Sequence, residues 1–117
     1  MEKHVRIGWL LDFYGGLLTG RQRQMLASYY DEDLSLAEIA QEQGVSRQAV
    51  HDALRRGEAA LEGLEQRLGL LSRHLALGEV LARGQRILEE AEPDTEALRR
   101  VLDQAVQIWE REGEHGL

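Results

Sequence analysis

Apolar residues recur at spacings of three and four along almost the whole chain, which is the period of a helix packed on one face. Ile7, Leu10, Leu11 and Tyr14 fall on one such face and predict a first helix over about residues 5–14. No stretch alternates apolar and polar residues as a strand would, and the chain contains one proline. Residues that favour helices, such as Leu, Ala, Glu and Arg, are abundant. The sequence therefore predicts an all-α protein.

The first helix is expected to end at Gly15-Gly16, because glycine is a poor helix former. Thr19 has the right chemistry to cap a second helix, and Gln22 stands three residues on, where a capping box needs it. This second helix is predicted to reach about residue 30. Its expected buried side chains are Met25, Leu26 and Tyr29.

The segment from Ser35 to Leu54 has the pattern of a helix-turn-helix. Ser35 and Glu38 form a capping box at the start of its first helix. Gly44 stands where that helix must stop, because glycine enters the left-handed conformation at little cost. Ser46 is expected to cap the second helix. The residues predicted to face inward are Leu36, Ile39, Ala40, Val45, Val50, Ala53 and Leu54.

The outer face of this second helix is polar and carries a candidate site. Arg and Gln side chains there suit base edges and phosphates, although a simple pair of helices with a solvated face has the same pattern. Arginines that precede the motif, at 21 and 23, and arginines that follow it, at 55 and 56, complete the expected basic patch. The predicted nucleic-acid-binding residues are Arg21, Arg23, Ser46, Arg47, Gln48, His51, Arg55 and Arg56. Asp52 lies on the same outer face and is expected to repel phosphate.

A ladder of leucines indicates that the second helix of the motif continues beyond Leu54. Its members are Leu61, Leu64, Leu68, Leu71 and Leu75. Gly57 and Gly63 weaken the helix locally, and a break within the ladder is expected at Gly69. Two interpretations stay open, an intramolecular core contact and a seam between two chains. The predicted division is a helix-turn-helix domain over 1–68 and a C-terminal helical extension over 69–117.

The extension is predicted to form a helical hairpin. Helices are expected over about 70–91 and from Asp94 or Thr95 to about residue 112, separated at Pro93. The expected apolar positions are Leu77, Val80, Leu81, Ile87 and Leu88 in one helix and Leu98, Leu102, Ala105 and Trp109 in the other. Residues 113–117 are predicted to be a frayed tail. The apolar stripes need covering by the first domain or by a second copy, and we expect a homodimer.

Charge limits how the chain could bind nucleic acid. The net charge is −7; residues 1–68 hold 8 basic and 11 acidic side chains, and residues 69–117 hold 6 and 10. Non-specific DNA affinity comes mostly from neutralised phosphates, so contact must rely on a local patch. The chain has no cysteine and no apolar run long enough to span a membrane, and no cleavage site follows its N-terminal apolar stretch. These features favour a cytoplasmic protein.

The sequence contains no recognisable catalytic or metal-binding pattern. His4, His51, His74 and His115 lack metal-ligand spacing, and no phosphate-binding glycine loop or nucleophile–base arrangement is present. We therefore expect no enzyme activity, cofactor or metal ion.

The segments 12–40 and 46–56 resemble the YlxM-like family of small bacterial helix-turn-helix proteins. The resemblance is carried by Asp12-Phe13-Tyr14, Tyr29-Tyr30 and Ser46-Arg47-Gln48-Ala49-Val50, and it covers roughly the first 70 residues. His51 and Ala53 depart from the family, which tends to have an aromatic residue and Asn there. The helix-turn-helix is also similar to region four of sigma factors, which reads promoter DNA.

The resemblance implies a regulator in the signal recognition particle pathway, since genes of this family lie beside that of the particle's GTPase. Its expected ligand is duplex DNA, with RNA as another possibility. An alternative is an acidic adaptor that binds the GTPase without binding DNA, which the net charge favours. A third is a structural dimer without a nucleic-acid role.

Overall fold

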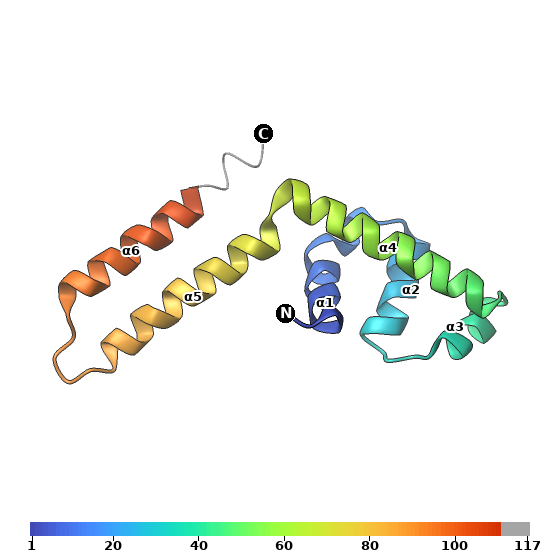
Figure 1. Cartoon of the computed structure of the whole chain (residues 1–117), viewed down its shortest axis with the longest axis horizontal. Coiled ribbons are helices and arrows are strands. Elements are labelled where there is room, and N and C mark those ends of the chain that lie inside the picture. The colour runs from blue at the N-terminus through green and yellow to red at the C-terminus, as the bar shows by residue number, and fades with distance from the viewer. Residues whose placement is uncertain (111–117) are drawn as a thin grey trace. The chain divides into compact units, whose positions relative to one another are not determined.

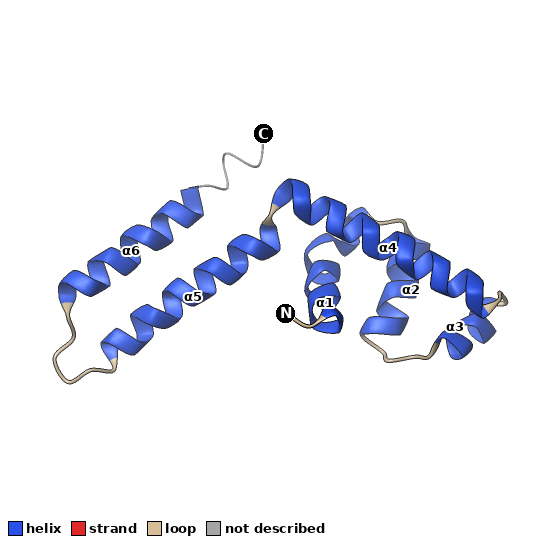
Figure 2. Cartoon of the chain, viewed as in Figure 1, coloured by secondary structure: helices blue, strands red, loops and turns tan. Residues whose placement is uncertain are grey.

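The computed structural model describes residues 1–110, and this part of the chain is helical without any strand (Figures 1 and 2). The elements are α1 (Lys3–Tyr14), the short 3-10 helix η1 (Gly15–Leu17), α2 (Gly20–Tyr30), α3 (Leu36–Gln43), α4 (Arg47–Leu68), α5 (Leu70–Leu88) and α6 (Thr95–Glu110). The all-α prediction is therefore confirmed. The predicted frayed tail over 113–117 lies outside the described residues.

The chain divides into two compact units, Met1–Gln66 and a second that begins at Arg67. The first contains α1, α2, α3 and nearly all of α4, and the second contains the antiparallel hairpin of α5 and α6 (Figure 1). α4 ends at Leu68, two residues beyond this division, and the domain boundary after residue 68 stays a prediction. Among the described residues, no helix is long and apolar enough to cross a membrane.

The helix starts of the first unit are fixed by the caps that the sequence predicts. Thr19 accepts a hydrogen bond from the backbone N–H of Gln22, whose side chain accepts one from the Thr19 N–H in return. Ser35 and Glu38 form the same reciprocal pair at α3. Each capping box satisfies two N–H groups that a helix start otherwise leaves without partners.

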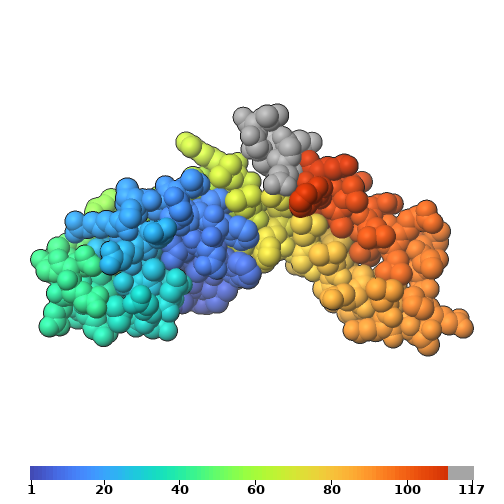
Figure 3. Space-filling view, turned by 180° about the vertical axis from the view of Figure 1, so that it is seen from behind, coloured from blue at the N-terminus to red at the C-terminus, as the bar shows by residue number. Residues whose placement is uncertain are grey.

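The core of the first unit joins residues from all four helices. Its fully buried side chains include Ile7, Leu10, Tyr14, Leu26, Ile39, Val50 and Leu61. The space-filling view shows α1 and α2 side by side in this unit (Figure 3). The predicted burial of Tyr29 is wrong: Tyr29 is half-buried, and its neighbour Tyr30 is buried at 7% exposure. Tyr30 points toward α4, where its hydroxyl donates to Glu58.

Gly57 lies where α4 crosses α2. A Cβ built at Gly57 would lie 2.8 Å from Cδ1 of Leu26, which is closer than real Cβ contacts. The absence of a side chain therefore lets the two helices approach closely. Gly63 lies six residues further along α4, and a Cβ built there has no atom within 4 Å.

The leucine ladder does not follow one continuous helix. Gly69 takes a left-handed conformation with φ 64° and separates α4 from α5. Leu61 is fully buried, as the intramolecular interpretation of the ladder expects, and Leu64 and Leu68 are half-buried. No part of Leu61 is left exposed to a second chain.

The hairpin of the second unit has a small core of Val80, Val101 and Ile108, with Ala76, Leu77, Ile87 and Ala105 packed on it. Gly84 lies opposite Val101, whose Cγ1 is 3.2 Å from a Cβ built on the glycine. Asp94 caps α6 by accepting from the N–H groups of Glu96 and Ala97.

Four of the apolar positions that need covering by the first domain or by a second copy are exposed in the single chain. They are Leu81, Leu88, Leu102 and Trp109. Both helices carry apolar stripes wider than the strip that a single neighbouring helix covers. The α5–α6 contact is centred on Val80 and Val101, so the residues directly after them lie at its edge.

Candidate nucleic-acid interface

The turn between α3 and α4 holds the two helices of the motif in place. Gly44 ends α3 in the left-handed conformation with φ 66°, and its N–H donates to the Ala40 carbonyl. Ser46 then caps α4, because its hydroxyl oxygen accepts from the Ala49 N–H at 3.0 Å. Val50 is buried one turn into α4 and fixes the rotation of the helix. The predicted two-helix geometry is thus present with both caps and its glycine turn.

Because Val50 and Leu54 point inward, the opposite face of α4 is turned to solvent. The predicted site residues at its N-terminal half, Ser46, Arg47, Gln48, His51, Arg55 and Arg56, are all exposed. No ion pair within residues 1–110 engages the three arginines of this set. Their guanidinium groups are available to a ligand.

Asp52 is the single acidic residue on this half of α4. Its Oδ1 accepts from Gln48 Nε2 at 2.9 Å and lies 3.6 Å from His51 Nδ1. The carboxylate is thereby held against its own helix, on the middle of the outer face. A carboxylate at that place meets base edges rather than phosphates if a groove receives the helix, and it can accept from the amino group of cytosine.

Two hollows flank the outer face of α4. One contains His51 and Arg55 together with Tyr29 and Leu36, and the other contains Arg56 and Arg21 together with Ala53. The structure therefore brings Arg21, from the start of α2, next to α4. The basic residues stand on both sides of the exposed face, where the two phosphate strands of a groove would run.

Arg23 is the predicted residue that lies elsewhere. It lines a hollow formed by α1, α2 and the turn between them, with Asp12, Gly15 and Asp31, and no residue of α4 contributes to it. Residues 21 and 23 are two positions apart in a helix, so their side chains leave on nearly opposite sides. The packing of α2 decides which one meets α4.

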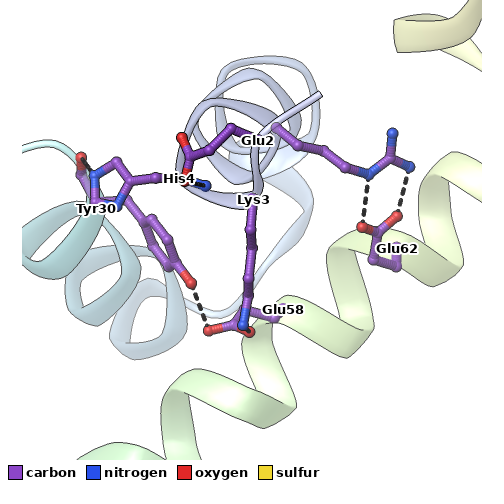
Figure 4. A network of polar contacts seen from close by, with 7 residues as sticks. Glu2, Lys3, His4, Tyr30, Glu58 and Glu62 are labelled. Atoms are coloured by element: carbon purple, nitrogen blue, oxygen red, sulfur yellow. Dashed lines mark hydrogen bonds and ion pairs between the residues drawn. The ribbon is translucent and has the colours of Figure 1, made fainter.

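The C-terminal half of α4 is acidic, and its carboxylates are used to hold the unit together (Figure 4). Glu58 accepts from the Tyr30 hydroxyl at 2.7 Å and pairs with Lys3 Nζ at 2.9 Å. Glu62 forms two parallel hydrogen bonds with Arg6, at 2.7 and 2.8 Å. These contacts tie α1 and α2 to α4, and sequence reasoning missed them because their partners lie 28 to 56 residues apart.

This network also shifts the ionisation of its members. The hydrogen bonds and charge of Arg6 lower the pKa of Glu62, because they favour the carboxylate. Burial and the neighbouring Glu58 carboxylate raise the pKa of Tyr30. The negative charge of the C-terminal half of α4 is thus paired with basic residues of α1. The exposed N-terminal half of α4 keeps a net positive charge.

Comparison with known proteins identifies the family. Residues 1–101 match the family model UPF0122, described as "Putative helix-turn-helix protein, YlxM / p13 like". This chain belongs to that family. The resemblance predicted from the sequence is confirmed, and the match extends beyond the first 70 residues through α5 into α6.

Relatives within the family are similar over nearly their whole length. A UPF0122 protein of Symbiobacterium thermophilum is 53% identical over 102 residues, covering 87% of this chain and 94% of the relative. Proteins of Bacillus mycoides and Bacillus cereus are 43% and 42% identical over 103 residues, with 88% of this chain and 94% of each relative covered. The family description names a helix-turn-helix and not an enzyme, and it indicates nucleic-acid binding.

Proposed function

We propose that this protein is a nucleic-acid-binding regulator that inserts the N-terminal half of α4 into the major groove of duplex DNA. The observation that carries the proposal is the exposed arginine set, free of ion pairs within residues 1–110, on a helix half that the buried Val50 and Leu54 hold against the core. A helix of this kind fits the width of the major groove, and its first residues reach the base edges.

The proposed roles follow from position on α4. Arg47 and Gln48, at the start of the helix, face the base edges, where Arg suits guanine and Gln suits adenine. The remaining predicted residues of the interface, Arg21, Ser46, His51, Arg55 and Arg56, face phosphates on the two sides of the groove. Arg23 is left out of this interface because it lines the hollow between α1 and α2.

The biological setting of the proposal rests on the family resemblance, which supports a role in the signal recognition particle pathway. One observation favours the adaptor alternative: residues 1–66 hold 7 basic and 11 acidic side chains, so the unit repels nucleic acid outside the α4 patch. An adaptor would bind the particle's GTPase through the same exposed face and would not retain DNA.

The test is a salt titration of binding. The full-length chain is titrated into fluorescein-labelled duplex DNA of mixed sequence between about 50 and 200 mM salt, and anisotropy gives the affinity. We expect Arg55→Ala and Arg56→Ala each to lower the slope of log affinity against log salt by about one. Arg23→Ala is the matched control, because it removes the same charge from the same unit. Since Arg23 lies outside the proposed interface, this variant should leave the slope unchanged.

Base reading is tested separately with duplexes that the wild-type chain selects from a random pool. Arg47→Ala is expected to weaken binding to the selected duplex by about 1–3 kcal/mol and to leave affinity for unselected DNA nearly unchanged. Particle RNA and the purified GTPase are assayed beside the DNA. Retention of the GTPase without any salt-dependent binding to duplex DNA would replace this proposal by the adaptor function.

A further inference from the structure

The hairpin of α5 and α6 leaves large apolar side chains in solvent. Leu102 is 62% exposed and Trp109 is 64% exposed, and three more exposed residues accompany them: Leu81, Leu88 and Val106. Scattered exposed leucines are ordinary in proteins, so the question is whether these five lie together.

The register of the hairpin shows that they do. Arg83 and Gln104 each follow a core residue, Val80 or Val101, by three positions, and their side chains hydrogen-bond at 2.6 Å on one side of the hairpin. In antiparallel helices, equal offsets from the facing residues lie on the same side. Leu81 and Leu102 each follow the same core residues by one position and therefore lie together on the opposite side.

The other exposed residues extend this apolar face along both helices. Leu88 is two turns beyond Leu81 in α5, and Val106 and Trp109 follow Leu102 by one and two turns in α6. We call these five residues the apolar hairpin face. Its reverse side is lined by the polar residues Glu79, Arg83, Arg86 and Gln104. Among the described residues of the hairpin, Leu75, at 37% exposure, is the one exposed large apolar residue outside the face. A hairpin that is apolar on one side and polar on the other is half of a four-helix bundle.

We propose that the apolar hairpin face binds the same face of a second copy, so that the protein is a homodimer held by a four-helix bundle. Residues 1–110 offer no other match. In the first unit the exposed large apolar residues are Met1, Val5 and Leu17, which form no comparable stripe among the described residues. Residues 111–117 contain one large apolar side chain, Leu117.

The available area fits this occupant. The five side chains, with the partly exposed Leu77 and Leu98 beside them, present roughly 400 Å² of apolar surface. One side of a standard interface covers about 800 Å², of which about 60% is apolar. Charge does not oppose the pairing, because residues 67–110 hold 6 basic and 8 acidic side chains and are nearly balanced. The dimer is independent of the proposed function.

The test is the mass of the full-length chain in solution by analytical ultracentrifugation. The wild type should sediment as a dimer, at twice the chain mass of 13.3 kDa. Leu102→Glu should raise the dimer dissociation constant by about 100-fold or more, because a two-fold interface buries the new charge twice. Leu17→Glu is the matched control, since Leu17 is 66% exposed and lies off the face, and it should stay dimeric.

Folding of the variants is checked by circular dichroism, because Leu102 lies outside the hairpin core and its replacement should leave the helices intact. In a Trp9→Phe background the fluorescence of Trp109 should shift to the red on dilution, as the indole becomes exposed. A monomeric wild type at micromolar concentration would overturn the proposal. So would a Leu102→Glu variant that dimerises as tightly as the wild type, since the interface would then lie elsewhere.

Discussion

Gly57 and Gly63 allow the packing of α4 on α2 to be tested with one pair of substitutions. Ala at either position lies within the same helix, so each change brings the same gain in helix propensity, about 0.5–1 kcal/mol. At Gly63 nothing lies within 4 Å of the new Cβ. We therefore expect Gly63→Ala to raise the free energy of unfolding by about that amount.

At Gly57 the new Cβ would meet Leu26, at 2.8 Å from Cδ1 and 3.2 Å from Cγ. Leu26 is 1% exposed, so its side chain has no room to turn away. Overpacking of this kind costs about 1–3 kcal/mol. Since the propensity gain is common to both variants, Gly57→Ala should be less stable than Gly63→Ala by that overpacking cost.

The measurement is urea unfolding followed by fluorescence in a Trp109→Phe background, where Trp9 reports on the first unit. The Leu26→Val substitution is the control: it should cost about 1 kcal/mol alone and clearly less together with Gly57→Ala, because it removes a methylene from the clash. Equal stabilisation by Gly57→Ala and Gly63→Ala would refute the close approach of α4 and α2.

Two further predictions concern single contacts of the first unit. Because Arg6 lowers the pKa of Glu62, this carboxyl binds more protons in the unfolded state than in the folded state. The stabilisation that the pair contributes is therefore present above the ordinary Glu pKa of 4.5 and is lost as the pH falls below it. The Glu62→Gln variant should therefore lose less stability than the wild type when urea unfolding is compared at about pH 6 and about pH 3. The two losses should differ by less than about 1 kcal/mol, because the pair is partly exposed. Equal losses in the variant and the wild type would contradict this prediction. Ser35→Ala should lower the free energy of unfolding by about 1 kcal/mol, and Ser35→Asp should retain it, since Asp also caps the helix. A fully stable Ser35→Ala variant would mean that the capping box is not needed.

The elements that sequence reasoning predicted well depend on chemistry within a few residues. The capping boxes at Thr19 and Ser35 and the left-handed glycine at Gly44 each act across one turn of chain, so the printed sequence contains both partners. The outward face of α4 follows in the same way, because Val50 and Leu54 define the inward one.

Other features of the candidate site depend on distant partners. Arg21 and Arg23 look equivalent in the sequence, and the packing of α2 puts Arg21 beside α4 and Arg23 in another hollow. Tyr29 and Tyr30 are also adjacent and chemically alike. The carboxylate of Glu58, 28 residues away, accepts from Tyr30, which is the one that is buried.

The sequence by itself determined the helical content, the caps, the turn of the motif and the polar face of α4, because these follow from local spacing and backbone preference. Tertiary structure alone decided the rotation of α5 and α6. Val80 and Leu81 are both apolar, as are Val101 and Leu102, and only the position of the opposite helix selects which of each pair is covered. Burial is a property of the neighbouring surface, and that neighbour lies outside the local sequence.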